Sequence, residues 1–380
     1  MRRILSLLIA AMLAVGIAAC AGVQASPDPA AIPTPEPADG CSLATEHLAN
    51  ARLIDLPLVD SVRQATGPST ACLPGHAIAR VSDVTAPVLP VSVIDAEGRP
   101  VTVTDVSRIL PIDISGTIAA TVFALGLGDN VVGRDTSTDF EGTETLPVVT
   151  KSGHTLNAEA ILQLAPTVVL TDTSIGPKEV RQQLRDAGIT VVVISSERRL
   201  DTTDELVDEI STALGVPTRG DALNERVRVE LDEVASEVAA VTPKNPEDRA
   251  RMLFLYVRGN ANIYYIFGRD TGADSLIESV GGIDVASEIG WEGAKPMTAE
   301  ALVAAQPDVI VMMTKGLESM GGVDGLLEKL PAVAQTPAGA NRRIIDMEDS
   351  HVLSFGPRTA EIVRALARAL YAPAAAGASE

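Results

Sequence analysis

A histidine and a tyrosine–arginine pair, far apart in the chain, carry side chains that suit ferric iron. His154 lies in the loop segment KSGHT, and Tyr256 and Arg258 belong to the segment LFLYVRGN. Residues two apart in a strand point to the same face, so we expect Tyr256 and Arg258 side by side. A neighbouring guanidinium favours the phenolate form and can hydrogen-bond it. Phenolate oxygen is a hard ligand for ferric iron, and imidazole is a common axial ligand of haem.

Each of these residues also has a simpler interpretation. His154 alone is equally compatible with a surface loop histidine that has no partner. Tyr256 alone is typical of a core tyrosine beside an arginine at the start of a loop. The choice depends on whether the fold brings the two segments together.

An internal repeat in the sequence predicts that the fold brings the segments of His154 and Tyr256 together. Residues 156–170 read LNAEAILQLAPTVVL and residues 297–311 read MTAEALVAAQPDVIV, at a constant offset of 141 residues. Each copy has the pattern of a short amphipathic helix, a proline and an apolar strand. The period is too long for a solenoid and suits two similar lobes. Small ligands bind in clefts between such lobes, and His154 and Tyr256 come from different halves.

The elements around the repeat predict an α/β fold. Strand and helix patterns alternate in both halves, which favours parallel sheets covered on both faces. A hairpin is expected within 90–112, and an apolar stripe predicts a long helix over 219–241. Strands or helices are expected at 109–112, 115–126, 130–133, 168–170, 178–187 and 190–194, and then at 252–257, 270–279, 309–312, 325–329, 344–345 and 358–370.

The N-terminus has the pattern of an exported protein. Arg2 and Arg3 precede a short apolar run that ends in Ala-Ala-Cys20, which indicates a signal peptide. Residues 21–40 are rich in proline and alanine, as in an extended tether. The two remaining cysteines, Cys41 and Cys72, are expected to form a disulfide outside the cytoplasm.

Charge and motifs exclude several functions. The formal net charge is −20, and −22 once Arg2 and Arg3 are removed, whereas nucleic-acid binding needs the opposite sign. The sequence has no G-x-S-x-G elbow, no P-loop and no HExxH motif, so an enzyme is not expected.

Residues 90–372 resemble the cluster A, or class III, substrate-binding proteins of bacterial ABC importers. The resemblance rests on the cysteine after Ala-Ala, the hairpin, the twin repeats, the single connecting helix and the segment LSFGPR before the last helix. It implies two Rossmann-like lobes joined by one long helix with the ligand cleft between them. It also implies a non-enzymatic carrier, lipidated at Cys20, anchored on the outer face of the cell membrane and serving an ABC permease dimer with its ATPase.

These features divide the chain into seven expected parts. They are a signal peptide (1–19), the lipidated cysteine and tether (20–40), an added segment with the disulfide (41–89), an N-terminal lobe (90–216), a linker helix (217–242), a C-terminal lobe (243–372) and a tail (373–380). The added segment departs from the family pattern.

The pattern GHTLNAEAIL, followed by a strand-end Y-x-R, is similar to the haem-binding lipoproteins of actinobacterial haem importers, the HmuT type. This resemblance implies that haem is the transported ligand. It further implies that His154 and Tyr256 are the axial iron ligands and that Arg258 supports the tyrosine. Asn260 and Asn262, in the loop after the strand, are candidates for the haem propionates.

Other cargoes fit the composition less well. Zinc or manganese carriers need three or four His, Asp or Glu ligands in the cleft, and His154, even with His351, supplies too few. Cobalamin needs aromatic walls, whereas aromatic residues make up 3% of the chain. A ferric siderophore is the main alternative, because arginines such as Arg134, Arg258 and Arg358 could hold an anionic ligand.

Glu159 and Glu300 occupy the same position in the two repeats, in the first helical turn. An acid there stabilises the helix dipole by roughly 0.3–1 kcal/mol, but so would an acid at any first-turn position. The family resemblance implies that the two glutamates pair with arginines on the permease dimer, one glutamate per lobe.

Overall fold

The computed structural model describes residues 41, 51–151 and 153–376. The expected signal peptide, the lipidation site at Cys20 and the tether lie outside these residues. Within the described part of the chain, no helix is long and apolar enough to cross a membrane.

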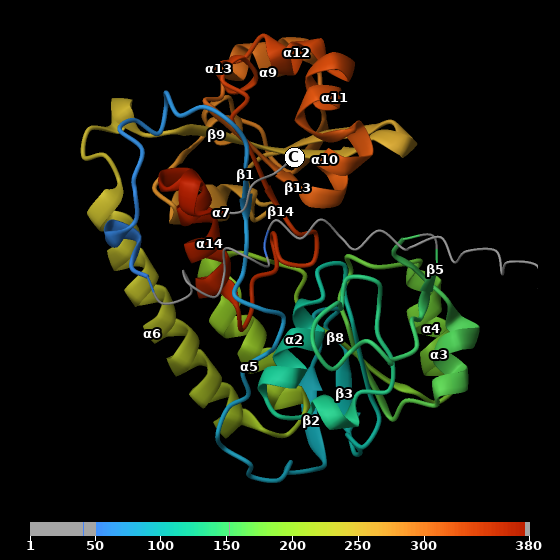
Figure 1. Ribbon diagram of the computed structural model, residues 1–380. Helices are drawn as coiled ribbons and strands as arrows, with labels where there is room; N and C mark the ends of the chain where they lie inside the picture. Colours follow the sequence, from blue (N-terminus) through green and yellow to red (C-terminus); the bar gives the residue numbers. More distant parts are fainter. Residues whose placement is uncertain (1–40, 42–50, 152, 377–380) are drawn as a thin grey trace, which may run out of the picture. The chain divides into compact units, whose positions relative to one another are not determined.

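The N-terminal lobe is built on the predicted parallel sheet. Its strand order is β4-β7-β8, and the hairpin β2–β3 forms a separate antiparallel pair. Helices cover both faces (Figure 1): α2 and α5 pack on one face, and α3 and α4 on the other. The elements are β2 (Val91–Ile94), β3 (Pro100–Val103), β4 (Ile109–Ile112), α2 (Thr117–Ala124), α3 (Ala158–Leu164), β7 (Val168–Thr171), α4 (Lys178–Asp186), β8 (Thr190–Val193) and α5 (Thr203–Ala213).

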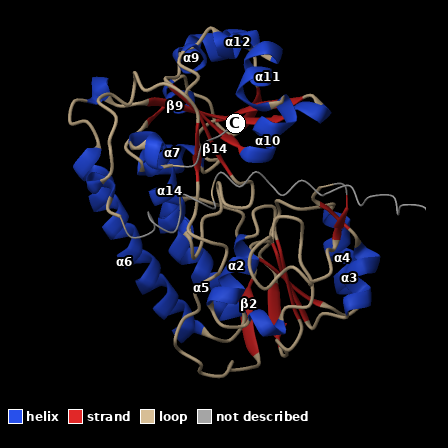
Figure 2. Cartoon of the chain, in the orientation of Figure 1, coloured by secondary structure: helices blue, strands red, loops and turns tan. Residues whose placement is uncertain are grey.

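The C-terminal lobe contains a larger sheet, which forms the second group of strands in Figure 2. Its strand order is β1-β14-β13-β9-β10-β12, with β11 paired to β9. The strands are β1 (Ser69–Ala71), β9 (Arg251–Arg258), β10 (Ile263–Phe267), β11 (Ile283–Asp284), β12 (Ala294–Pro296), β13 (Val309–Met313) and β14 (Ile344–Met347). The helices are α7 (Ala273–Ser279), α8 (Val285–Glu288), α9 (Ala299–Ala305), α10 (Thr314–Met320), α11 (Gly322–Lys329), α12 (Pro331–Ala334), α13 (Pro337–Ala340) and α14 (Thr359–Tyr371).

Two expectations about the strands were wrong. The C-terminal sheet is mixed, because β10 runs antiparallel to both β9 and β12. Residues 130–133 do not form a strand; Val131 makes only an isolated bridge to Ile109, after a short 3-10 turn at Gly128–Asn130. Three residues after Val131, Arg134 bridges to Val148, so the pairing with β4 does not continue.

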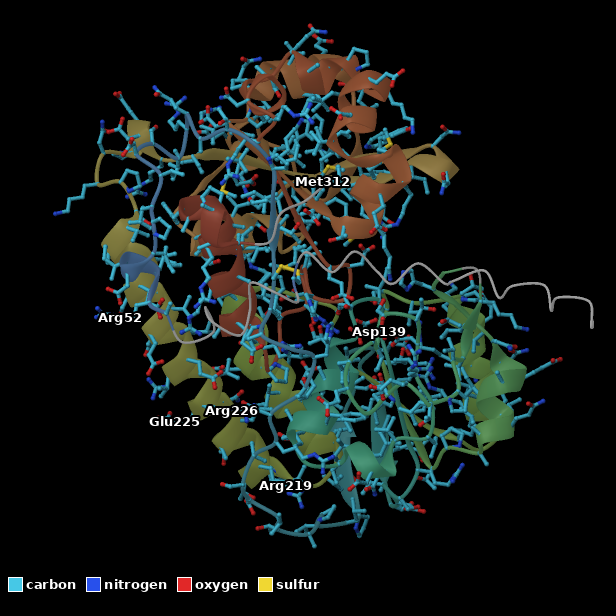
Figure 3. The ribbon with its side chains drawn as sticks, viewed as in Figure 1. Arg52, Asp139, Arg219, Glu225, Arg226 and Met312 are labelled. Carbon is cyan, nitrogen blue, oxygen red and sulfur yellow. A yellow bond between two sulfur atoms is a disulfide. The ribbon has the colours of Figure 1, made fainter. Side chains whose placement is uncertain are left out.

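A single long helix, α6 (Pro217–Val241), connects the two lobes as predicted. It packs against α5 of the first lobe and α14 of the second (Figure 1). Leu223, Val227, Val234 and Val238 form its buried stripe. The buried Arg219 in its first turn donates to the carbonyls of Thr85 and Leu125, and it is labelled in Figure 3. The residues at which each lobe is expected to begin and end, 90–216 and 243–372, stay a prediction.

The first part of the added segment, up to Leu73, packs in the C-terminal core, whereas its last part contacts the N-terminal lobe, where the N–H of Val81 donates to the Ala124 carbonyl. Its strand β1 pairs in parallel with β14, and Leu53 and Val62 pack in the same hydrophobic cluster as α14. The expected disulfide between Cys41 and Cys72 is present, with the Cα atoms 5.3 Å apart. The segment therefore extends the C-terminal sheet by one strand.

The internal repeat is also a structural repeat. Both helices, α3 and α9, end in a left-handed residue, Ala165 (φ 44°) and Gln306 (φ 46°), immediately before the proline. In each copy an arginine that flanks or begins a neighbouring strand caps the helix: Arg108 donates to the Leu164 carbonyl, and Arg251 to the equivalent Ala305 carbonyl. The same turn and the same cap therefore occur at equivalent positions in both halves.

Candidate functional site

The side chain of Tyr256 lies near the end of β9, in a row of aromatic rings. Phe254, Tyr256 and Arg258 alternate along the strand, and β10 places Phe267 opposite Phe254. The Phe267 ring stacks on Tyr256 with centroids 5.5 Å apart and an interplanar angle of 14°. This row fixes the plane of the half-buried Tyr256 ring.

Arg258 and Tyr256 are side by side as predicted, but their contact differs from the expectation. The guanidinium carbon of Arg258 lies 4.6 Å from the centroid of the Tyr256 ring, over its face. No hydrogen bond joins it to the phenol oxygen among the described residues; it donates instead to the carboxylate of Asp349 at 2.5 Å. The expected hydrogen bond is thus replaced by a cation–π contact, because Asp349 offers a charged acceptor.

The end of β9 is held by close packing of α10. Lys315, on that helix, donates its backbone N–H to Asp349, the partner of Arg258. Gly316 allows the approach, since a Cβ atom there would lie 2.8 Å from the carbonyl oxygen of Val257. The Arg258–Asp349 pair is therefore fixed by backbone contacts on both sides.

His154 lies in the turn between two short strands, β5 (Thr150–Lys151) and β6 (Thr155–Leu156). The Thr136 hydroxyl donates to the carbonyl of Gly153, and the N–H of Leu156 donates to the carbonyl of Gly176. These bonds fix the loop just before α3, where the sequence predicted it.

Charged groups of both lobes act on the imidazole of His154. Burial lowers its pKa, and the positive charge of Arg258 lowers it further, while Asp113 and Asp349 act in the opposite sense. His154 therefore lies close enough to Arg258 and Asp349 for their charges to affect its pKa. Its Nδ1 atom is buried and has no hydrogen-bond partner among the described residues. A neutral imidazole with an unpaired nitrogen can bind a metal centre.

Asn260 and Asn262 are less well placed. Both side chains are exposed, in and just after the 3-10 turn Gly259–Ala261 that follows β9. Their role as ligand contacts stays a prediction.

Sequence reasoning missed an array of acids in the N-terminal lobe. Asp113 and Asp172 each directly follow a buried strand, and Arg198 bonds to Asp172 at 2.8 Å and to Asp113 at 3.5 Å. Burial and the neighbouring Asp113 raise the pKa of Asp135 to about 7 and that of Asp172 to about 6. The signal was available, because acids at the carboxyl ends of parallel strands gather at one edge.

Several contacts join the lobes near this edge. The Arg199 guanidinium pairs with Asp274 at 2.9 Å, and the Thr117 hydroxyl lies 3.2 Å from that of Ser354. His154 and Tyr256 thus belong to lobes that contact each other directly.

Residues 113–350 match the model of a family described as periplasmic binding protein. The chain belongs to this family. The match includes the connecting helix and most of both lobes; it begins after β4 and ends before α14. The ABC transporter substrate-binding lipoprotein YvrC of Bacillus subtilis (strain 168) is 28% identical over 75% of this chain and 86% of its own length.

Among solved structures, the heme binding protein HmuT is 44% identical, with a TM-score of 0.77, over 82% of this chain and 99% of that chain. Variants of HmuT in which alanine replaces a histidine, a tyrosine or an arginine have also been solved, and the tyrosine and the arginine stand two positions apart. The cobalamin-binding protein of Halobacterium salinarum is less similar, at 25% identity over 84% of this chain and 85% of its own length.

Proposed function

We propose that this protein captures haem outside the cytoplasmic membrane and delivers it to an ABC permease for import. The single observation that carries the proposal is the likeness to HmuT over nearly the whole folded chain, at 44% identity. Family membership supports a binding protein in preference to an enzyme. The relative from B. subtilis is a lipoprotein, which supports lipid anchoring at Cys20.

We assign the haem iron to His154 and Tyr256, one ligand from each lobe. The replaced tyrosine and arginine of HmuT have the two-residue spacing of Tyr256 and Arg258, and a histidine is the third replaced residue. The unpaired buried nitrogen of His154 and the half-buried Tyr256 support the same assignment.

Arg258 then acts on the ligand tyrosine through its charge. A guanidinium over the ring face stabilises negative charge on the phenol, and Asp349 holds the guanidinium in that place. Arg258 is on this account a positioning residue, with no hydrogen bond to the ligand oxygen.

Glu159 and Glu300 are proposed to dock the carrier on the permease. Both are exposed in the first turns of α3 and α9, and neither forms an ion pair within the described residues. Beside Glu300 lies a surface groove lined by Met297, Val303, Leu330 and Pro331. A free acid next to an apolar groove can receive an arginine and its neighbours from a partner.

Titration of the apo-protein with haemin tests the proposed cargo. Haemin is expected to produce a saturable shift of the Soret band, whereas cyanocobalamin and the anionic siderophore complex ferric enterobactin, added separately, are expected to leave the protein fluorescence and melting temperature unchanged. Saturable binding of cyanocobalamin or ferric enterobactin with no response to haemin would assign the protein to one of the alternative cargoes.

A further inference from the structure

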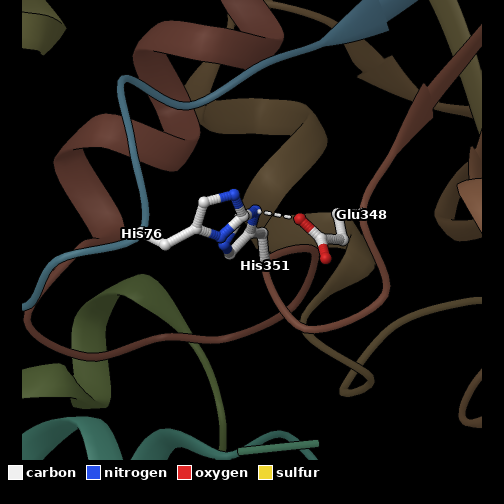
Figure 4. Close-up of side chains that lie close together, drawn as sticks. All are labelled: His76, Glu348 and His351. Carbon is white, nitrogen blue, oxygen red and sulfur yellow. Dashed lines mark ion pairs between the residues drawn. The ribbon is translucent and has the colours of Figure 1, made fainter. Parts of the chain in front are cut away.

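A second group of metal-binding side chains contains neither His154 nor Tyr256. His76, Glu348 and His351 each offer one ligand atom, and these atoms lie within 4.8 Å of one another (Figure 4). His351 is buried, Glu348 is half-buried and His76 is exposed. Two imidazoles and one carboxylate form a donor set that zinc uses where a fourth position stays open.

The added segment brings His76 to this place. Because β1 and β14 pair in parallel, the residues after both strands leave the same edge of the sheet. His76 follows β1, and Glu348 and His351 follow β14. The segment is fixed at two points: the Gly75 carbonyl accepts from Arg358, and the His76 carbonyl accepts from the N–H of Glu141.

His351 is oriented by a single turn of chain. Its N–H donates to the carbonyl of Glu348, so the two side chains stand three residues apart on one side of the turn. Its Nδ1 lies 3.4 Å from the Glu348 carboxylate, and its ring centroid lies 5.6 Å from that of His76. Its Nε2 is buried without a hydrogen-bond partner among the described residues, in a side chain only 10% exposed. One nitrogen of this buried ring thus lies beside the Glu348 carboxylate and the other is unpaired, and either ring nitrogen of a histidine can bind a metal ion.

The surrounding charges favour a cation. His76 and Glu348 line a surface hollow together with three further acids, Asp139, Glu141 and Glu144. Asp139, labelled in Figure 3, is close enough to raise the pKa of Glu348 through its charge, although burial raises that pKa more. Lys315 and Arg358 are the basic groups that act on Glu348 and His351. Acids outnumber bases around the cluster, so the local field attracts a positive ion.

We propose that His76, Glu348 and His351 bind a divalent first-row transition ion, with Zn²⁺ as the best-suited one, and that this ion ties the added segment to the loop after β14. Two imidazoles select against Mg²⁺ and Ca²⁺, which require oxygen ligands. Tetrahedral zinc holds such donors about 3.3 Å apart, as follows from its usual bond lengths. The donor atoms lie within 4.8 Å of one another, and rotation of the exposed His76 side chain can bring its ring nitrogen to the shorter distance. This site is separate from the cargo site and does not depend on which cargo the protein carries.

Equilibrium titration of the untagged, chelator-treated mature protein with Zn²⁺, against a chromophoric zinc chelator, tests this site. The parent protein is expected to bind one Zn²⁺. His76→Ala and Glu348→Gln each remove a ligand from an accessible position, so each is expected to weaken binding by more than the ~10–100-fold that loss of an outer-shell partner costs. Mg²⁺ is expected not to compete. The matched control is His154→Ala, which removes the other described histidine that lies at a proposed site.

The outcomes separate clearly. Retention of zinc binding in His154→Ala, with its loss in His76→Ala and Glu348→Gln, supports the site. Equal zinc binding by the parent and His76→Ala, or its loss in His154→Ala, overturns it. Far-ultraviolet circular dichroism and the melting temperature of zinc-free His76→Ala report on folding, and parental values there show that the variant is intact whatever cargo the protein carries.

Discussion

Tyr256→Phe is expected to abolish the phenolate-to-iron charge-transfer absorption of the ferric haem complex and to accelerate haem loss. The substitution keeps the ring that stacks between its neighbours and removes only the ligand oxygen, so the fold is preserved. Loss of an iron ligand is expected to weaken haem retention by more than the ~10–100-fold that an outer-shell substitution costs. Absorption spectra and the rate of haem transfer to an excess of an apo-haem acceptor measure the two effects.

The matched control is Tyr264→Phe. Tyr264 lies on β10 and packs against the opposite face of the sheet, with the helices that follow β12. It is therefore expected to keep the parental spectrum. His154→Ala removes the other proposed ligand and is expected to change the spin state of the iron. If both Tyr256→Phe and His154→Ala keep the parental spectrum, the assignment of the ligands is wrong.

The double variant Glu159→Ala/Glu300→Ala is expected to bind haem normally and to fail in haem uptake. The two carboxylates are exposed, one per lobe, at equivalent positions of a structural repeat. A permease with twofold symmetry can bind both carboxylates at once. Each ~1.4 kcal/mol of binding free energy that is lost lowers the affinity of the carrier for the permease tenfold. Growth on haemin as the iron source, in a strain that lacks the native gene, measures the loss.

A control with the same change in charge is Glu179→Ala/Glu328→Ala. These residues are also exposed acids, one in each lobe, outside the two repeat helices. Their variant is expected to support growth like the parent. Unchanged uptake by the Glu159/Glu300 variant would leave only the helix-dipole role for the two glutamates.

Much of the fold could be predicted because the local signals agreed. Apolar runs such as Ile109–Ile112 are buried on both faces, which is the pattern of a parallel sheet, and a single stripe marked α6. The strand β10 was missed since the sequence after Arg258 contains a Gly-Asn loop, which indicated an end to the sheet. In the structure that loop is a tight turn, and Ile263–Phe267 folds back on β9.

The candidate site was predictable in its residue types and less so in its contacts. His154 and Tyr256 were found by their chemistry and by the repeat. Asp349 was not found, because its pairing with Arg258 joins residues 91 positions apart. His76 was assigned to an added segment of unknown role, and only the pairing of β1 with β14 shows that it meets His351. Such contacts depend on tertiary topology, which no local pattern encodes.

A crystal structure of the protein with ferric haem tests the central claim most directly. We expect the porphyrin between the lobes, with the iron bonded to the phenol oxygen of Tyr256 on one side and to an imidazole nitrogen of His154 on the other. Arg258 is expected to remain over the tyrosine ring, paired with Asp349. Haem bound elsewhere, or iron ligated by His76 or His351 in place of His154 and Tyr256, would contradict the account.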